Sequence, residues 1–182
     1  MTNQLHANLL RLDGVVAGEV LEAMYRASEI LRSHNIPHVL IGGLAVSAYG
    51  HVRATSDVDF LVTDAAFIKY STGLVLLKAP VVSIGKVRID MLAFDSTDAD
   101  TPAFDREVNE QYKQSDYLQV VSMPTLIHLK LKANRQKDIA DVIELLKAGS
   151  VDIESVEQYF KQYVPRLNMR WECVKRQART EE

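Results

Sequence analysis

The sequence predicts an α+β fold in which a mixed β-sheet with flanking helices is followed by a helical C-terminal part. Two observations predict it. Short apolar segments bounded by glycine, proline and polar residues recur through the first part of the chain, as β-strands do. From residue 122 onward, apolar residues instead follow steps of three and four, which indicates amphipathic helices. We therefore divide the 182 residues into 1–121, an α/β core with an N-terminal helix, and 122–182, a helical part packed on that core.

The core is expected to alternate between helical and extended segments. Apolar residues at helical spacing predict a helix at 15–34, which Asn35 and Pro37 end. A stretch rich in Asp, Thr, Glu and Gln predicts a surface loop with little regular structure at 95–116. The other expected elements are a strand at 38–41, a short helix at 44–49, a strand at 58–63, one or two helical turns at 65–70, a hairpin over 81–92 and a strand at 117–121.

Four helices are expected in the second part. Ser122 and Pro124 mark the start of the first, and Gly149 marks the end of the second. The expected ranges are about 122–134, 136–148, 152–163 and 166–178.

Composition restricts the class of protein. The formal net charge is −3, so the chain as a whole lacks the basic character of a nucleic-acid-binding protein. A single cysteine, Cys173, excludes an internal disulfide and fits a reducing compartment. No apolar stretch reaches the length of a membrane span, and the N-terminus does not resemble a secretory signal. We expect a cytoplasmic protein without a membrane partner.

The most informative segment contains Gly42-Gly43 and, shortly after it, Asp57-Val58-Asp59. Alternate residues of a strand share a face, so the two carboxylates lie about 7 Å apart on one side of the sheet. They repel each other unless a cation lies between them, and Mg²⁺ prefers such oxygen ligands. Glycines before a helix let backbone N–H groups approach a phosphate. The segment therefore predicts a metal site beside a phosphate site.

The same segment resembles the nucleotidyltransferases of the DNA polymerase β superfamily. Arg53, Thr55, Asp57 and Asp59 are similar to the R-x-T-x-D-x-D form in minimal relatives of the abortive-infection type toxin nucleotidyltransferases. The resemblance covers roughly residues 37–148. It implies that the core is nucleotidyltransferase-like, that Mg²⁺ or Mn²⁺ is the cofactor, and that a nucleoside triphosphate is the substrate.

Asp90 is the expected third carboxylate. It lies between Ile89 and Met91, on a strand that would pair beside the strand of Asp57 and Asp59. Transfer with two metals uses three carboxylates, and Asp90 would be both a metal ligand and a base for the attacking hydroxyl. The alternative is an acid on a solvated face of the sheet.

A second segment, MPTLIHLKLKANRQKDIADVIELL, resembles the helical block that follows the core in the same toxin-like group. That likeness assigns Lys130, Lys137 and Asp138 to the nucleotide site, with Lys130 stabilising charge on the leaving group. The alternatives are a snorkelling surface lysine for Lys130 and an exposed i,i+4 ion pair between Lys137 and Asp141.

Arg53 and Ser56 directly precede the acidic strand. A guanidinium at that position would contact the triphosphate. The alternative is that both residues belong to a solvated loop.

These features predict an enzyme that moves a nucleoside monophosphate from a triphosphate to a hydroxyl group. The acceptor is RNA, a protein side chain or a small molecule, and the toxin-like resemblance adds an antitoxin-like partner. The alternative from another class is a catalytically silent module of the same fold, which binds a nucleotide or another protein.

Overall fold

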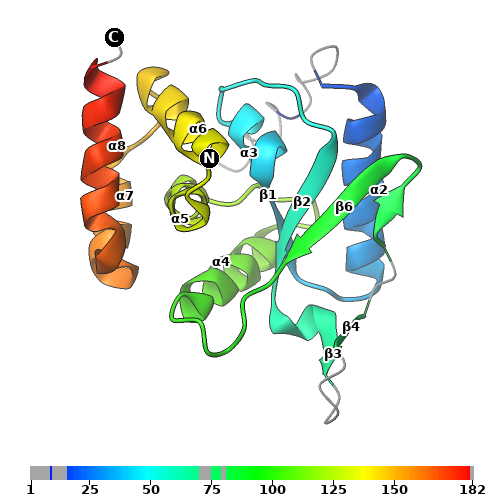
Figure 1. Cartoon of the computed structure of the whole chain (residues 1–182). Coiled ribbons are helices and arrows are strands. Elements are labelled where there is room, and N and C mark those ends of the chain that lie inside the picture. Colours follow the sequence, from blue (N-terminus) through cyan, green and yellow to red (C-terminus); the bar gives the residue numbers. More distant parts are fainter. Residues whose placement is uncertain (1–8, 10–15, 70–74, 79–80, 181–182) are drawn as a thin grey trace.

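The computed structural model describes residue 9 and residues 16–69, 75–78 and 81–180. A four-stranded mixed sheet lies at the centre of the first part of the chain (Figure 1). The strand order is β1-β2-β6-β5, and only β2 and β6 run parallel. The strands are β1 (His38–Ile41), β2 (Asp57–Val62), β5 (Ser83–Ile84) and β6 (Val87–Leu92).

Three helices of the first part pack on this sheet. Helix α2 (Gly18–Ser33) contacts β2, β5 and β6, while α4 (Thr101–Gln114) contacts β1 and β2. The short helix α3 (Gly42–Ala48) connects β1 to the segment before β2 and packs against both strands. Strand β1 is buried along its whole length, and β2 is buried except at Asp57 and Asp59. Leu40 and Phe60 are 0% exposed.

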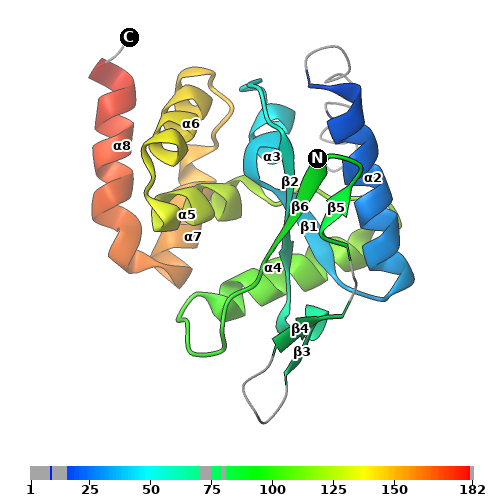
Figure 2. The ribbon, with the colours of Figure 1, turned by 45° about the vertical axis from the view of Figure 1, so that its right-hand side comes forward.

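The second part is helical throughout and lies to one side of the sheet (Figures 1 and 2). Helix α5 packs against α3, α6 and α7, and α6 packs against α8. Trp171 and Phe160 contact each other in the core of this part. The helices are α5 (Met123–Ala133), α6 (Gln136–Lys147), α7 (Ile153–Tyr163) and α8 (Asn168–Thr180), with a 3-10 turn, η2 (Pro165–Leu167), between the last two.

The predicted α+β layout is confirmed, with its mixed sheet, flanking helices and helical C-terminal part. The boundary between 1–121 and 122–182 stays a prediction. Within the described residues, no helix is both long and apolar enough to cross a membrane.

The prediction of a loop at 95–116 is wrong, because α4 occupies most of that range. The helix buries only a narrow stripe that includes Ala103, Phe104 and Val108, and the rest of its surface is polar. So few apolar residues in a polar stretch give only a weak helical pattern in the sequence. The helix is stabilised by its packing on β1 and β2 rather than by its own sequence propensity.

Two smaller predictions of the core are also wrong. The helical turn expected at 65–70 is a 3-10 turn, η1 (Asp64–Ala66), followed by strand β3 (Phe67–Lys69), which pairs with β4 (Val75–Leu77) in a separate two-stranded sheet. The strand expected at 117–121 makes only one parallel bridge, between Val120 and Leu40.

His38 makes the stability of the core dependent on pH. Its Nδ1 lies 2.8 Å from the Ile36 carbonyl oxygen, which can only accept, and its Nε2 lies 2.7 Å from the Ser28 hydroxyl. The neutral ring therefore satisfies both contacts. Burial, opposed by the Ile36 hydrogen bond and assisted by the positive charge of Arg32, lowers the pKa of His38 to about 4.

We predict that stability falls as the pH drops from about 6.5 to about 4, because the unfolded chain takes up the His38 proton first. The contribution of this residue is on the order of 3 kcal/mol. Urea unfolding at several pH values should show a smaller loss in His38→Gln than in the wild type. The same pH dependence in both proteins would contradict this assignment.

Candidate functional site

The sheet register brings three carboxylates together. Asp57 and Asp59 alternate with Val58 on β2, and the parallel pairing places Asp59 opposite Asp90 of β6. One oxygen from each of the three carboxylates lies within 4.8 Å of the other two. In the described part of the chain, no other three His, Cys, Asp or Glu residues come together in this way.

The electrostatics of the cluster favour a bound cation. Burial raises the pKa of Asp59, and the negative charges of Asp57 and Asp90 raise it further, against the opposing effect of Lys130 and Lys137. A carboxylate that is difficult to ionise in the free protein gains most when a cation neutralises its neighbours. Three converging carboxylate groups offer only oxygen ligands, which is the donor set that Mg²⁺ and Mn²⁺ prefer. The residues present therefore fit a divalent metal ion.

Gly42 lets the chain pass directly over one of these acids. Its φ angle is +70°, a conformation that favours glycine, and a Cβ atom there would lie 1.9 Å from Asp59 Oδ2. The predicted helix at 44–49 in fact begins at Gly42, so both glycines belong to its first turn.

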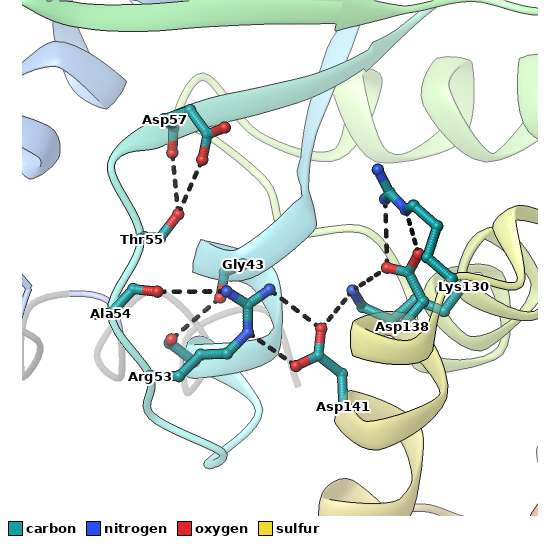
Figure 3. Close-up of polar contacts among 10 residues, drawn as sticks. Gly43, Arg53, Ala54, Thr55, Asp57, Lys130, Asp138 and Asp141 are labelled. Carbon is teal, nitrogen blue, oxygen red and sulfur yellow. Dashed lines mark hydrogen bonds and ion pairs between the residues drawn. The ribbon is translucent and has the colours of Figure 1, made fainter.

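Gly43 is close to the segment that precedes β2. A Cβ atom at this position would lie 3.0 Å from Thr55 Oγ1 and 3.2 Å from the Arg53 guanidinium. The Thr55 hydroxyl donates to Asp57 Oδ1 at 3.1 Å and so orients this carboxylate (Figure 3). A serine in place of Gly43 would have no room unless Arg53 and Thr55 moved.

The acids and glycines border a cleft of about 550 Å³ between the sheet and the C-terminal helices. Of the predicted site residues, Ser56 does not line it. Part of its wall is apolar, with Met91 and Leu92 from β6 and Leu126 and Leu129 from α5. The predicted site residues that do line it are Gly42, Gly43, Arg53, Asp57, Asp59, Asp90, Lys130, Lys137 and Asp138.

Lys130 belongs to a buried ionic network (Figure 3). Its Nζ lies 3.1 Å from Asp138 Oδ1 and 2.6 Å from Asp141 Oδ2, and the residue is 5% exposed. Arg53 donates to both oxygens of Asp141, and Arg135 donates to Asp138 at 2.5 Å. The network joins the loop before β2 to helices α5 and α6.

The network shows that the alternative interpretations of Lys130 and of the Lys137–Asp141 pair are both wrong. Lys130 is not a snorkelling surface lysine, because its ammonium group is enclosed. Asp141 does not pair with Lys137 on an exposed face, since it is buried against Arg53 and Lys130. Arg53 and Lys130 are held by acids of the protein itself.

The acids of the network are held in their ionised form. Burial acts to raise the pKa of Asp141, but the hydrogen bonds from Arg53 and Lys130 outweigh it and lower the pKa. Burial is likewise outweighed at Asp138, where Arg135 and Lys130 lower the pKa. Each of the two buried acids has two cationic partners, so removing Lys130 would weaken the compensation of both.

Sequence reasoning missed Arg88 and Arg135 and considered Asp141 only as an exposed ion-pair partner. Arg88 NH2 lies 2.6 Å from Asp90 Oδ2 and 3.4 Å from Asp57 Oδ2. The sequence spacing could have indicated both arginines. Arg88 precedes Asp90 by two residues on a strand, and Arg135 precedes Asp138 by three near the start of a helix, so each pair shares a face.

No protein-family model matches the sequence, and no curated protein matches it significantly. Among solved structures, the chain is similar to an antigenic nucleotidyltransferase-like protein from Paracoccidioides brasiliensis. The two share 17% sequence identity, the TM-score is 0.45, and the alignment covers 84% of this chain and 92% of the other.

Lys130 and Lys137 provide a matched pair for testing the network. We predict that Lys130→Met lowers the free energy of unfolding by about 2–3 kcal/mol, because it removes the buried ammonium group that contacts both Asp138 and Asp141 and leaves each carboxylate with one arginine partner. Lys137→Met removes an exposed lysine of the same cleft and should change stability by no more than about 0.5 kcal/mol. Urea denaturation measures both, and equal stability of the two variants would rule out a buried network around Lys130.

Proposed function

We propose that the protein is a Mg²⁺-dependent nucleotidyltransferase, which transfers a nucleoside monophosphate from a nucleoside triphosphate to a hydroxyl acceptor and releases pyrophosphate. One observation carries this proposal: three carboxylates from two paired strands meet at one point in a cleft, directly beside a glycine pair. A triphosphate needs neutralising cations, and the acids supply a place where divalent metal ions can hold it.

The residues would divide the chemistry between them. Asp57 and Asp59 would hold the metal that the triphosphate shares, and Asp90 would help to hold the metal beside the acceptor. Such metals neutralise the charge that develops on the phosphates and lower the pKa of the attacking hydroxyl. Thr55 supports this arrangement, because its hydrogen bond to Asp57 Oδ1 restricts the orientation of that ligand.

In the proposed reaction, the acceptor oxygen forms a bond to the α-phosphorus, and the bond from that phosphorus to the bridging oxygen of the β-phosphate breaks. Pyrophosphate leaves, and Asp90 accepts the hydroxyl proton. Backbone N–H groups near Gly42 and Gly43 would contact the phosphates, and the exposed Lys137 would balance their charge. Lys130 would act mainly by positioning α5 and α6 at the cleft, because it is committed to Asp138 and Asp141.

The acceptor class and the toxin-like role with an antitoxin-like partner stay predictions from the sequence resemblance. The cytoplasmic location stays a prediction from the single cysteine and the N-terminal sequence. The alternative function, a catalytically silent module, would have the same site but would not transfer a nucleotide. A transfer assay therefore separates the two functions.

We predict that the wild type transfers label from at least one α-labelled nucleoside triphosphate when Mg²⁺, total RNA and total protein extract are supplied. Asp59→Asn should lower the rate at least about 100-fold, because it removes a charged metal ligand. It should also unfold at an equal or higher urea concentration, since burial and two neighbouring acids disfavour the Asp59 charge.

Asp116→Asn is the matched control, because Asp116 is exposed and outside the cleft. It should keep the wild-type rate. Absence of transfer by the wild type with every triphosphate would favour the silent module, and an undiminished rate in Asp59→Asn would exclude the acidic cluster as the catalytic site.

A further inference from the structure

Arg88 is the one described cation of the cleft wall that forms an ion pair with the acidic cluster itself. It lies opposite Asp57 in the parallel pairing of β2 and β6, and two residues before Asp90 on the same strand face. Its NH2 group is 2.6 Å from one carboxylate and 3.4 Å from the other. The guanidinium therefore sits between two of the three acids at which a metal ion would bind.

The other cations of the cleft do not take this role. Arg53 and Lys130 are bound to Asp141, and Arg135 is bound to Asp138, while Lys137 acts on Asp59 through its charge at longer range. Without Arg88, only the longer-range charges of Lys130 and Lys137 would oppose the repulsion among the three carboxylates. The arrangement of the side chains thus makes Arg88 the neutralising group of the cluster when no metal is present.

The Arg88 contact and a metal ion compete for the same space. An Mg²⁺ ligand lies about 2.1 Å from the ion, so an ion bound by Asp57 and Asp90 would take the position that the guanidinium now holds. Two positive groups at that separation also repel each other strongly. The Arg88 side chain is 67% exposed, so it can leave the acids without disturbing the packing of β6.

We propose that Arg88 is an internal counter-cation, which a divalent metal ion displaces from Asp57 and Asp90 and which then binds the triphosphate that arrives with the metal. The binding of the triphosphate by Arg88 rests on the proposed nucleotidyltransferase function. A guanidinium matches phosphate oxygens with two parallel hydrogen bonds, and Arg88 already lines the cleft. Metal binding would free Arg88 for the triphosphate, and binding of the triphosphate to Arg88 would free Asp57 and Asp90 for the metal. Each ligand therefore increases the affinity of the protein for the other.

The test measures metal binding alone, without nucleotide. Mn²⁺ is titrated into the wild type, Arg88→Gln and Arg176→Gln, and the free ion is followed by electron paramagnetic resonance. Arg176 is exposed on α8 and does not line the cleft, so its substitution makes the same change in net charge elsewhere. Arg88→Gln should bind Mn²⁺ about 3- to 10-fold more tightly than the wild type, the range expected for losing one or two exposed ion pairs. Arg176→Gln should match the wild type.

A second measurement follows Arg88 directly. Its Nε–Hε nuclear magnetic resonance signal is identified by its absence from Arg88→Gln, and Mg²⁺ is then added to the wild type. The signal should shift with the same apparent dissociation constant as metal binding, which a residue with a merely structural role would not show.

With Mg²⁺ at saturation, Arg88→Gln should bind a non-hydrolysable triphosphate about 10-fold more weakly than Arg176→Gln. Unchanged or weaker metal affinity in Arg88→Gln overturns the proposal, and so does unchanged triphosphate affinity.

Asp59→Asn separates this failure from that of the proposed function. If Asp59→Asn loses Mn²⁺ binding but Arg88→Gln matches the wild type, only the role of Arg88 is wrong. If Asp59→Asn binds Mn²⁺ as the wild type does, both proposals fail at the acidic cluster.

Discussion

Electrostatic repulsion among Asp57, Asp59 and Asp90 is the constraint on which the rest of this site depends. The parallel register of β2 and β6 holds the three carboxylates together, whether or not a cation is present. Because the sheet fixes their separation, the acids cannot relax apart, and the chain supplies a guanidinium from Arg88. A rigid cluster of this kind is already arranged for a divalent ion, so little conformational order needs to be created when the ion binds.

A second group of charges joins the two sides of the cleft beside the acidic cluster. Arg53, Lys130 and Asp141 form a buried ionic contact between residues far apart in the sequence, and it fixes the C-terminal helices against the loop before β2. These cations form their ion pairs with Asp138 and Asp141, and they act on the acidic cluster only at longer range. The division into a structural network and an acidic cluster explains why two groups of aspartates lie so close together without merging.

The sequence predicted the acids well and their surroundings poorly, for physical reasons. Alternation along a strand is local, so Asp57 and Asp59 were placed on one face and Asp90 on a neighbouring strand without tertiary information. The ionic network around Lys130 depends on folding, since Arg53 contacts Asp141 across 88 residues of sequence and no periodic pattern connects the two. Helix α4 was missed because its buried stripe is narrow, and packing rather than propensity stabilises it.

If the three carboxylates form one divalent metal site, as we propose, the ion can be located directly in crystals. The most direct measurement is an anomalous difference map from crystals that hold Mn²⁺ and a non-hydrolysable triphosphate, collected near the manganese absorption edge. We expect a manganese peak within about 2.5 Å of carboxylate oxygens from Asp57 and Asp59, with Asp90 beside it and the Arg88 guanidinium turned away. A map with no manganese peak among these acids, while the triphosphate is bound in the cleft, would contradict this expectation.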